Sequence, residues 1–190
     1  MIDYKILSES IKHYENLGFT RIETPWMVPE CIDDLTKPKD KRHFQLEHNK
    51  KCLVASGEQS FLYLYMKGFL PKGKFQTITP CFRDEYVDEI HGKYFMKNEL
   101  IITDNIPGGL YDMVKSAGDF FKQYIDSKYL FYVETDDGLD IIYHKDNVKI
   151  ELGSYGVRKC NFLTWIYGTG CAEPRLSNLL NMINNGSKRV

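Results

Sequence analysis

Two strand-like segments joined by a charged loop constrain the fold of this chain more than any other feature. Residues 75–83 and 94–103 are rich in β-branched and aromatic side chains, and the loop between them reads DEYVDEIHGK. Such a pattern predicts a long antiparallel hairpin.

The remaining segments predict helices gathered around more antiparallel strands. Strands are predicted at residues 19–24, 52–55, 129–135, 139–144, 148–152 and 162–167, and helices at 6–17, 59–68, 107–125 and 174–183. The sequences Asp136-Asp137-Gly138 and Lys145-Asp146-Asn147 favour tight turns. The polar stretch 36–51 is interpreted as a connection. The predicted fold class is α+β, a mostly antiparallel β-sheet flanked by helices.

Length and charge limit the possible classes of protein. At 190 residues the chain fits one domain, and its net charge of -1 gives no general basic field for nucleic acid. No stretch approaches the ~18 apolar residues of a membrane span, and the N-terminus lacks the features of a signal peptide. Five scattered cysteines, an odd number, are typical of reduced thiols. We expect a cytoplasmic protein with no membrane partner.

A metal site in the polar stretch is weighed against a simple loop. His43, His48 and Cys52 lie close in sequence, but no paired ligand spacing recurs elsewhere in the chain. The polar-loop interpretation is therefore favoured.

Three segments, taken in order, resemble the motifs of one enzyme family. Phe82-Arg83-Asp84-Glu85, followed by Phe95-Met96-Lys97-Asn98-Glu99, resembles motif 2 of the class II aminoacyl-tRNA synthetases. Residues 168–175, GTGCAEPR, resemble motif 3, and residues 18–25, GFTRIETP, resemble motif 1. The chain thus resembles a minimal catalytic core of the seryl/threonyl/prolyl-like subgroup. Motif 1 is placed at about 6–29, motif 2 at about 75–103 and motif 3 at about 162–184, within one domain of residues 1–190.

The resemblance implies ATP-dependent activation of an amino acid. A carboxylate must attack the α-phosphate of ATP, and guanidinium groups neutralise two such anions with directed hydrogen bonds. Arg83 and Arg175 are the implied catalytic residues. Arg83 holds the α-phosphate and the amino-acid carboxylate, and Arg175 reaches the γ-phosphate or the base.

The other implied ATP contacts lie in the same motifs. Glu85 accepts from the adenine amino group and Phe95 stacks on the base. Gly168 and Gly170, with Ala172, let a nucleotide approach closely. Simpler interpretations stay open: a surface arginine paired with a carboxylate, a core phenylalanine, and a glycine turn with a capping arginine.

Two weaker matches to the family concern the residues that would bind a metal ion and the amino acid. Glu151 and Ser154 resemble the ExxS segment that holds Mg²⁺ between phosphates in seryl-type enzymes, and oxygen ligands suit that ion. The alternative is an edge-strand glutamate with a turn serine. Ser56-Gly57-Glu58 resembles the TxE segment, so Glu58, with Arg83 and Glu99, is implied to bind the amino acid. The serine-like features indicate a small amino acid.

Two departures from the family pattern bear on which molecule accepts the aminoacyl group. The motif 2 loop is acidic and offers only His91 and Lys93 as basic groups, and no segment is assigned to an anticodon-binding domain. The stretch from Lys37 to Arg42 is either an RNA contact or a solvated loop. The acceptor is therefore a tRNA, a carrier protein or a small amine.

Two other functions are weighed. A catalytically inactive paralogue would bind nucleotide or amino acid in a regulatory role. A purely structural subunit would only dimerise through its first helix and strand, with Phe19, Trp26 and Met27 exposed. We expect catalysis together with a homodimer.

Overall fold

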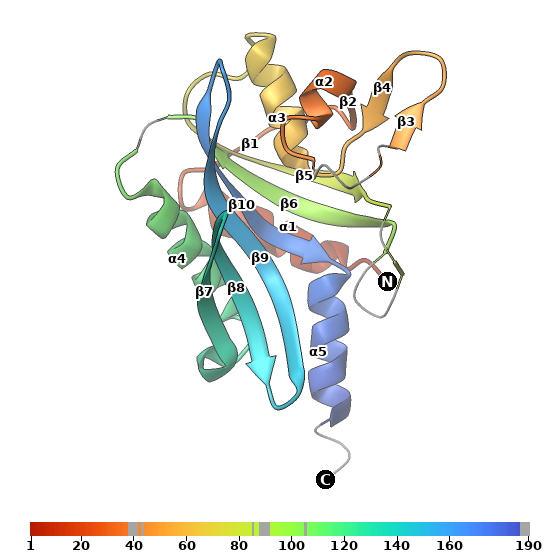
Figure 1. The fold of residues 1–190 in the computed structure, drawn as a ribbon. Coiled ribbons are helices and arrows are strands. Elements are labelled where there is room, and N and C mark those ends of the chain that lie inside the picture. The colour runs from red at the N-terminus through yellow and green to blue at the C-terminus, as the bar shows by residue number, and fades with distance from the viewer. Residues whose placement is uncertain (38–41, 43, 85, 88–91, 105, 187–190) are drawn as a thin grey trace.

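The computed structural model describes residues 1–37, 42, 44–84, 86–87, 92–104 and 106–186. A seven-stranded sheet forms the framework of the protein (Figure 1). Its strand order is β1(Thr20–Arg21), β5(Lys74–Phe82), β6(Tyr94–Ile102), β10(Thr164–Glu173), β9(Val148–Lys159), β8(Gly138–Lys145) and β7(Leu130–Thr135). All neighbours in this sheet are antiparallel except β1 and β5. The predicted fold class is confirmed.

The central hairpin is formed by β5 and β6. Their register runs without interruption from the pair Lys74–Ile102 to the pair Phe82–Tyr94. A backbone hydrogen bond of 2.9 Å from Arg83 to the carbonyl of Lys93 extends the pairing by one step. This rigid pair carries Arg83 at the end of one strand and Phe95 near the start of the other.

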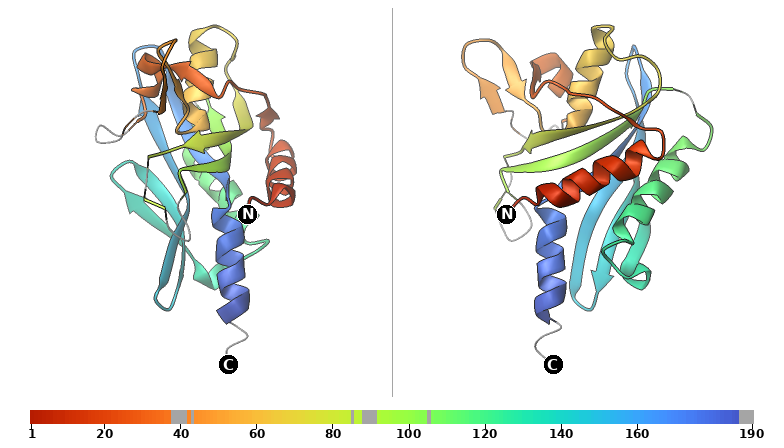
Figure 2. Two further views of the ribbon diagram at one scale, coloured as in Figure 1. Left: turned by 90° about the vertical axis from the view of Figure 1, so that its right-hand side faces the viewer. Right: turned by 180° about the vertical axis from the view of Figure 1, so that it is seen from behind.

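Helices cover the back of the sheet. The helix α1(Tyr4–Glu15) and the helix α4(Gly109–Phe121) lie against it when the molecule is seen from behind (Figure 2, right). Their apolar residues pack on the alternate side chains of β6, including Leu100 and Ile102. The short 3₁₀ helix η1(Ser127–Tyr129) leads from α4 into β7.

A second core forms on the other face. The helix α3(Gly57–Met66) packs there with Phe61 and Leu62 against Ile101, Trp165 and other residues of the large sheet. Ile101 points to this face while its neighbours point to the other, as the two-residue period of a strand requires. The sheet therefore separates two apolar cores.

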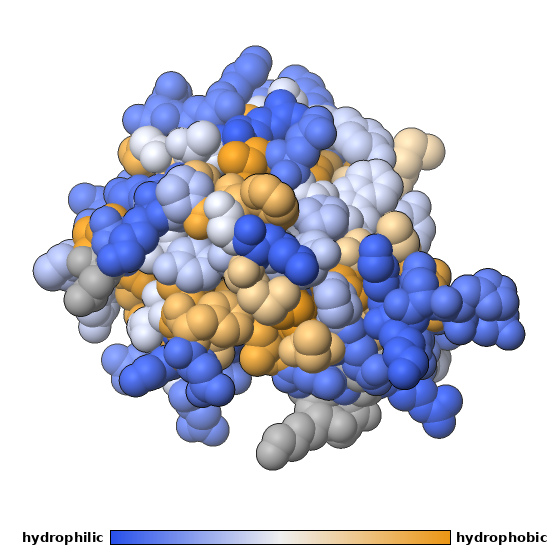
Figure 3. Space-filling view, turned by 90° about the horizontal axis from the view of Figure 1, so that it is seen from above, coloured by the Kyte–Doolittle hydropathy of each residue, from blue (hydrophilic) through white to orange (hydrophobic). Residues whose placement is uncertain are grey.

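A small sheet adjoins α3. It has the order β2(Met27–Pro29), β4(Lys51–Leu53), β3(Phe44–Leu46), and the helix α2(Glu30–Asp33) follows β2. β3 lies inside the stretch that the sequence analysis treats as a connection, so that prediction is wrong there. Strands of three residues are too short for alternation to reveal them. The end of the molecule that carries this small sheet is seen in Figure 3, where hydrophobic side chains gather centrally among hydrophilic ones.

Two strands extend beyond their predicted ends. β9 continues to Lys159, and β10 continues through the glycines to Glu173, so residues 168–170 lie inside a strand rather than at its end. The last helix, α5(Arg175–Gly186), follows directly. These extensions decide which side chains reach the site described below.

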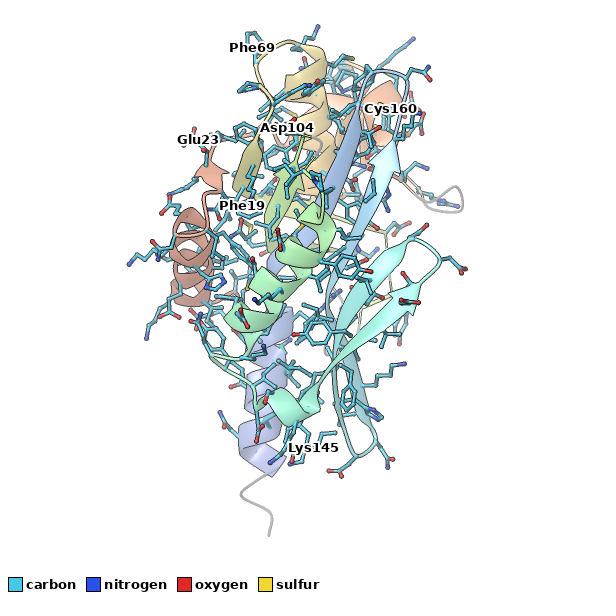
Figure 4. All side chains as sticks on the ribbon, turned by 90° about the vertical axis from the view of Figure 1, so that its left-hand side faces the viewer. Phe19, Glu23, Phe69, Asp104, Lys145 and Cys160 are labelled. Atoms are coloured by element: carbon cyan, nitrogen blue, oxygen red, sulfur yellow. The ribbon has the colours of Figure 1, made fainter. Side chains whose placement is uncertain are left out.

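Phe19 differs from its expected exposure. Phe19, labelled in Figure 4, is 3% exposed. Its ring lies 5.9 Å from the ring of Tyr14 on α1. Trp26 and Met27 are exposed as expected, at 56% and 41%. Among the described residues, no helix is long and apolar enough to cross a membrane.

Candidate active site

A cavity of about 400 Å³ lies where the central hairpin, β9, β10, the start of α3 and the start of α5 meet. Both predicted catalytic arginines, Arg83 and Arg175, line it, although they come from distant parts of the chain. Other predicted site residues that line it are Glu58, Phe95, Glu151 and Ser154. The cavity therefore brings together most of the groups that the sequence analysis selects.

Arg83 is held at the end of β5. Its Nε donates to the carbonyl oxygen of Ala55 at 3.1 Å, and its guanidinium carbon lies 5.1 Å from the centre of the Phe95 ring. A cation over an aromatic face is attracted by the ring quadrupole. The side chain is thus positioned beside Phe95 by a backbone hydrogen bond and a ring contact.

Phe95, Lys97 and Glu99 share one face of β6, because they are two residues apart. Lys97 Nζ lies 2.9 Å from Glu99 Oε1, and Ser56 Oγ donates to Glu99 Oε2 at 2.5 Å. Glu99 is fully buried, and it does not line the cavity, whereas Lys97 and Ser56 do. Glu99 therefore lies beneath the cavity lining and orders the two side chains above it.

Arg175 is the first residue of α5 and pairs with Glu151 on β9. Its Nη1 donates to Glu151 Oε1 at 3.2 Å and to the carbonyl oxygen of Glu151 at 3.1 Å. The Arg175 side chain is 17% exposed and that of Glu151 48%. A partly exposed ion pair of this kind contributes little to stability, so Arg175 can readily exchange Glu151 for a more strongly bound anion.

A β-bulge explains how Glu151 and Ser154 reach the same cavity. Residues three apart on a regular strand point to opposite faces. Here Ile142 pairs with Glu151 and the adjacent Ile141 pairs with Gly153, so Leu152 is the extra residue. The bulge turns Ser154 to the side of Glu151, which the ExxS spacing requires.

Oxygen donors at this point fit a magnesium ion. Mg²⁺ binds proteins through one or two carboxylates and keeps several waters, so a half-exposed glutamate and a serine hydroxyl that line the same cavity are a suitable donor set. Among the described residues, no group of three or more His, Cys, Asp or Glu could hold a metal by themselves. Of the three residues of the polar stretch that were weighed as metal ligands, His43 lies outside the residues that the structure describes.

Glu58 occupies a different part of the cavity and is 3% exposed. Its Oε1 accepts from Trp165 Nε1 at 2.6 Å, and its Oε2 accepts from Arg158 Nη1 at 2.6 Å. Burial raises the pKa of the Glu58 carboxyl, and Arg158 and Trp165 oppose that rise by stabilising the ionised form. The carboxylate predicted to bind the amino acid is therefore already paired with a cation.

The two glycines of the motif 3 segment do not line the cavity. A Cβ on Gly168 would lie 2.4 Å from Met113 Sδ, and one on Gly170 would lie 2.8 Å from Tyr14 Cε2. Both positions therefore face the core beneath α1 and α4, and they leave room for large core side chains rather than for a nucleotide. Thr169 and Ala172 line the cavity instead, on either side of a bulge between Thr169 and Cys171.

Two predictions on the motif 2 loop cannot be placed. Glu85, the predicted adenine contact, and His91 lie outside the described residues. Of the basic stretch, residues 38–41 are also outside them, whereas Lys37 and Arg42 line the cavity. These two side chains adjoin the site rather than forming a separate patch.

The sequence analysis misses Arg158 and Tyr167 as cavity residues. Both belong to parts of β9 and β10 at or beyond the predicted strand ends. Had the strand been extended, the two-residue period from Ser154 would have placed Arg158 on the same face. That alternation is the signal that could have found it.

Comparisons with known proteins support the fold. No family model matches the chain. An aspartate--tRNA(Asp/Asn) ligase of Ehrlichia ruminantium is 35% identical over 85 residues, which is 43% of this chain and 13% of the ligase. The chain thus matches only a small part of that relative's length.

Solved structures match over nearly the whole chain. A pyrrolysyl-tRNA synthetase from Desulfitobacterium hafniense has a TM-score of 0.69 at 18% identity, covering 96% of this chain and 69% of that one. A seryl-tRNA synthetase from Pyrococcus horikoshii, complexed with ATP, has a TM-score of 0.70 at 13% identity and covers 90% and 48%. A cytoplasmic serine-tRNA ligase from Naegleria fowleri, in complex with AMP, has a TM-score of 0.69 at 14% identity and covers 91% and 46%. The chain therefore has the fold of the catalytic domain of class II aminoacyl-tRNA synthetases.

Proposed function

We propose that this protein activates an amino acid with ATP, forming an aminoacyl-adenylate and pyrophosphate, and that residues 1–190 act as one catalytic domain. The observation that carries the proposal is that Arg83 and Arg175 line one cavity together with Phe95. Solved structures with this fold contain ATP or AMP. Retention of both arginines favours an enzyme over the inactive paralogue, because packing the fold requires neither guanidinium.

The chemistry requires two anions to meet. The carboxylate of the amino acid attacks the α-phosphorus, the new acyl–phosphate bond forms, and pyrophosphate leaves with the electrons of the broken bond. Arg83 neutralises both reacting anions, and Phe95 stacks on adenine beside it. Arg175 exchanges Glu151 for the γ-phosphate. No protein nucleophile is needed, since positioning and charge neutralisation lower the barrier.

Glu151 and Ser154 would hold Mg²⁺, which supplies positive charge against the triphosphate when bound. Release of Glu151 from Arg175 would free this carboxylate for the ion and the guanidinium for the phosphate. The ion pair between Arg175 and Glu151 would thus be replaced by two pairs with the ligand.

The acyl acceptor is a tRNA end, a carrier protein or a small amine. Proteins with related folds or sequences are named for tRNA charging with pyrrolysine, serine and aspartate. These names differ in the amino acid, so they support the reaction class rather than one substrate.

We also propose that the protein is a homodimer. A hollow of about 470 Å³ beside β1 and β2 is lined by Trp26 and Met27, which are exposed, and by parts of β1 and β5. Exposed apolar residues around a hollow are typical of a surface that another chain covers. Sedimentation of the wild type and of Trp26→Glu would test this assembly, and a wild-type monomer would contradict it.

The reaction is tested by pyrophosphate–ATP exchange with each of the twenty amino acids, with ATP binding followed separately by calorimetry. We expect exchange with at least one amino acid. ATP binding without any exchange would favour the inactive paralogue. Failure of Arg83→Ala to weaken ATP binding would contradict the placement of the nucleotide.

A further inference from the structure

One end of the cavity carries a charged cluster that the nucleotide does not need. Glu58, Arg158 and Tyr167 line the cavity, and Trp165 supports them from below at 2% exposure. Arg158 and Trp165 are direct cross-strand partners on β9 and β10. The cluster therefore stands on a rigid pair of strands.

Arg158 has donor capacity beyond its contact with Glu58. Its Nη1 donates to Glu58 Oε2, and its guanidinium carbon lies 4.1 Å from the centre of the Tyr167 ring. A guanidinium has five N–H donors. Among the described residues, the hydrogen bonds of this side chain run only through Nη1, and the side chain is 31% exposed within the cavity lining.

Two ion pairs lie in and just beneath the lining of the cavity. Glu58 is paired with Arg158, and Glu99 with Lys97. Four carboxylates line the cavity, those of Glu58, Asp84, Asp137 and Glu151, and of these only Glu58 is buried. An amino acid adds an ammonium group, which needs a carboxylate, and the buried Glu58 is the one we place beside it. Sharing Glu58 with an ammonium group would leave the charge of a half-buried guanidinium only partly compensated, which is unfavourable.

The α-carboxylate of the substrate cannot supply the missing anion. It must meet the α-phosphate beside Arg83, and adenylate formation removes its charge. A second carboxylate, on the side chain of the amino acid, would restore the balance at Arg158. A guanidinium fork matches a carboxylate in shape as well as in charge.

On the basis of the proposed function, we propose that Arg158 determines specificity and that the activated amino acid carries a side-chain carboxylate. The contact with the Tyr167 ring holds the guanidinium in place, and Glu58 binds the α-ammonium beside it. The serine-like residues indicate only a small polar or small apolar amino acid, and the surroundings of Arg158 favour an acidic one.

The direct test compares each acidic amino acid with its amide, which has the same shape without the charge. Exchange rates and calorimetric affinities are measured for aspartate against asparagine and for glutamate against glutamine. We expect at least one acid to exceed its amide by about tenfold or more. Equal values for acid and amide, or a preference for serine or another neutral amino acid, would overturn the assignment.

A variant separates specificity from a structural role. Arg158→Gln should bring the ratio of acid to amide to about one while ATP binding stays unchanged, and Arg158→Lys should restore part of the preference. Lys159→Gln, an exposed neighbour on β9, is the matched control and should keep the wild-type ratio. A ratio unchanged in Arg158→Gln would show that Arg158 serves only as the counter-ion of Glu58.

Loss of folding in Arg158→Gln is addressed with Glu58→Gln/Arg158→Gln, which removes both buried charges together. This double variant should also lose the acid preference in binding. If no amino acid supports exchange, the proposed reaction fails, whereas the calorimetric ratio of acid to amide still decides the assignment of Arg158. Exchange with a neutral amino acid alone would leave the reaction standing and reject the acidic substrate.

Discussion

Arg175 and Glu151 form an ion pair at 3.2 Å, so the cationic group at the start of α5 is partnered by the carboxylate assigned to magnesium. The bulge at Leu152 places Ser154 in the same cavity. In the proposed function, one carboxylate would have two roles, as partner of Arg175 without ATP and as a metal ligand with ATP.

This pairing predicts a metal-dependent effect of Glu151→Gln. Removing the carboxylate frees Arg175, so ATP affinity without metal should stay the same or rise slightly, because the pair is partly exposed. The gain in affinity on adding Mg²⁺ should fall by about tenfold, as expected for loss of a ligand. Calorimetry with and without Mg²⁺ measures both. An unchanged metal effect would remove Glu151 from the site.

Phe95→Ala should weaken ATP binding by about 1–3 kcal/mol, the usual worth of a base stacked on an aromatic ring. Phe95→Tyr keeps a ring and should bind almost as the wild type does. Phe69→Ala serves as the control, since Phe69 is 75% exposed and lies outside the cavity. Equal loss in the control and in Phe95→Ala would point to a general effect on folding.

Gly168→Ala should lower stability, since the added Cβ would lie 2.4 Å from Met113 Sδ and 2.5 Å from Tyr155 Cδ1. Overpacking of this kind costs about 1–3 kcal/mol. ATP affinity of the folded protein should change little, because the glycine faces the core. Denaturant unfolding and calorimetry separate the two quantities. A stable variant with weak ATP binding would instead return Gly168 to the nucleotide site.

Amino-acid binding should depend on pH through Glu58. The ammonium group needs the ionised carboxylate, and burial raises the pKa of Glu58 above the ordinary value of about 4.3. Affinity should therefore fall as the pH drops through this raised pKa. The same shift favours the protonated carboxyl on folding, so its contribution to stability is full below about 4.3 and is lost as the pH rises through the folded pKa.

Calorimetric titrations that start near the ordinary glutamate pKa of about 4.3 and continue to about pH 8 measure this dependence. Glu58→Gln should bind more weakly and show a flatter profile than the wild type. A wild-type profile that is flat over this range would mean that the ammonium is bound elsewhere.

The sequence predicts the frame of the fold well because its strongest signals are local. The hairpin of β5 and β6, the hairpins of β7 to β9, and the four long helices α1, α3, α4 and α5 each follow from periodicity and turn residues within one segment. The parallel pairing of Thr20 with Phe75 and the three-residue strands of the small sheet depend on distant contacts, which periodicity does not reveal.

The site is predicted where family motifs and local chemistry agree, as for Arg83, Phe95 and Arg175. Site residues are missed where a strand continues beyond the apolar segment that identifies it in the sequence. The glycines of β10 look like a turn in sequence, but they accommodate Tyr14 and Tyr155 from other elements. Arg158 lies beyond the predicted end of β9, and its partner Glu58 comes from another part of the chain.

Pyrophosphate–ATP exchange in the wild type and Arg83→Lys tests the central claim most directly. Radioactive pyrophosphate should enter ATP only when an amino acid is added, and Arg83→Lys, which keeps the charge but loses the paired geometry, should reduce the rate by about 100-fold or more. Lys159→Arg, a charge-conserving change at an exposed residue of β9 that does not line the cavity, should exchange as the wild type does. Full exchange in Arg83→Lys, or none with any amino acid in the wild type, would contradict the account.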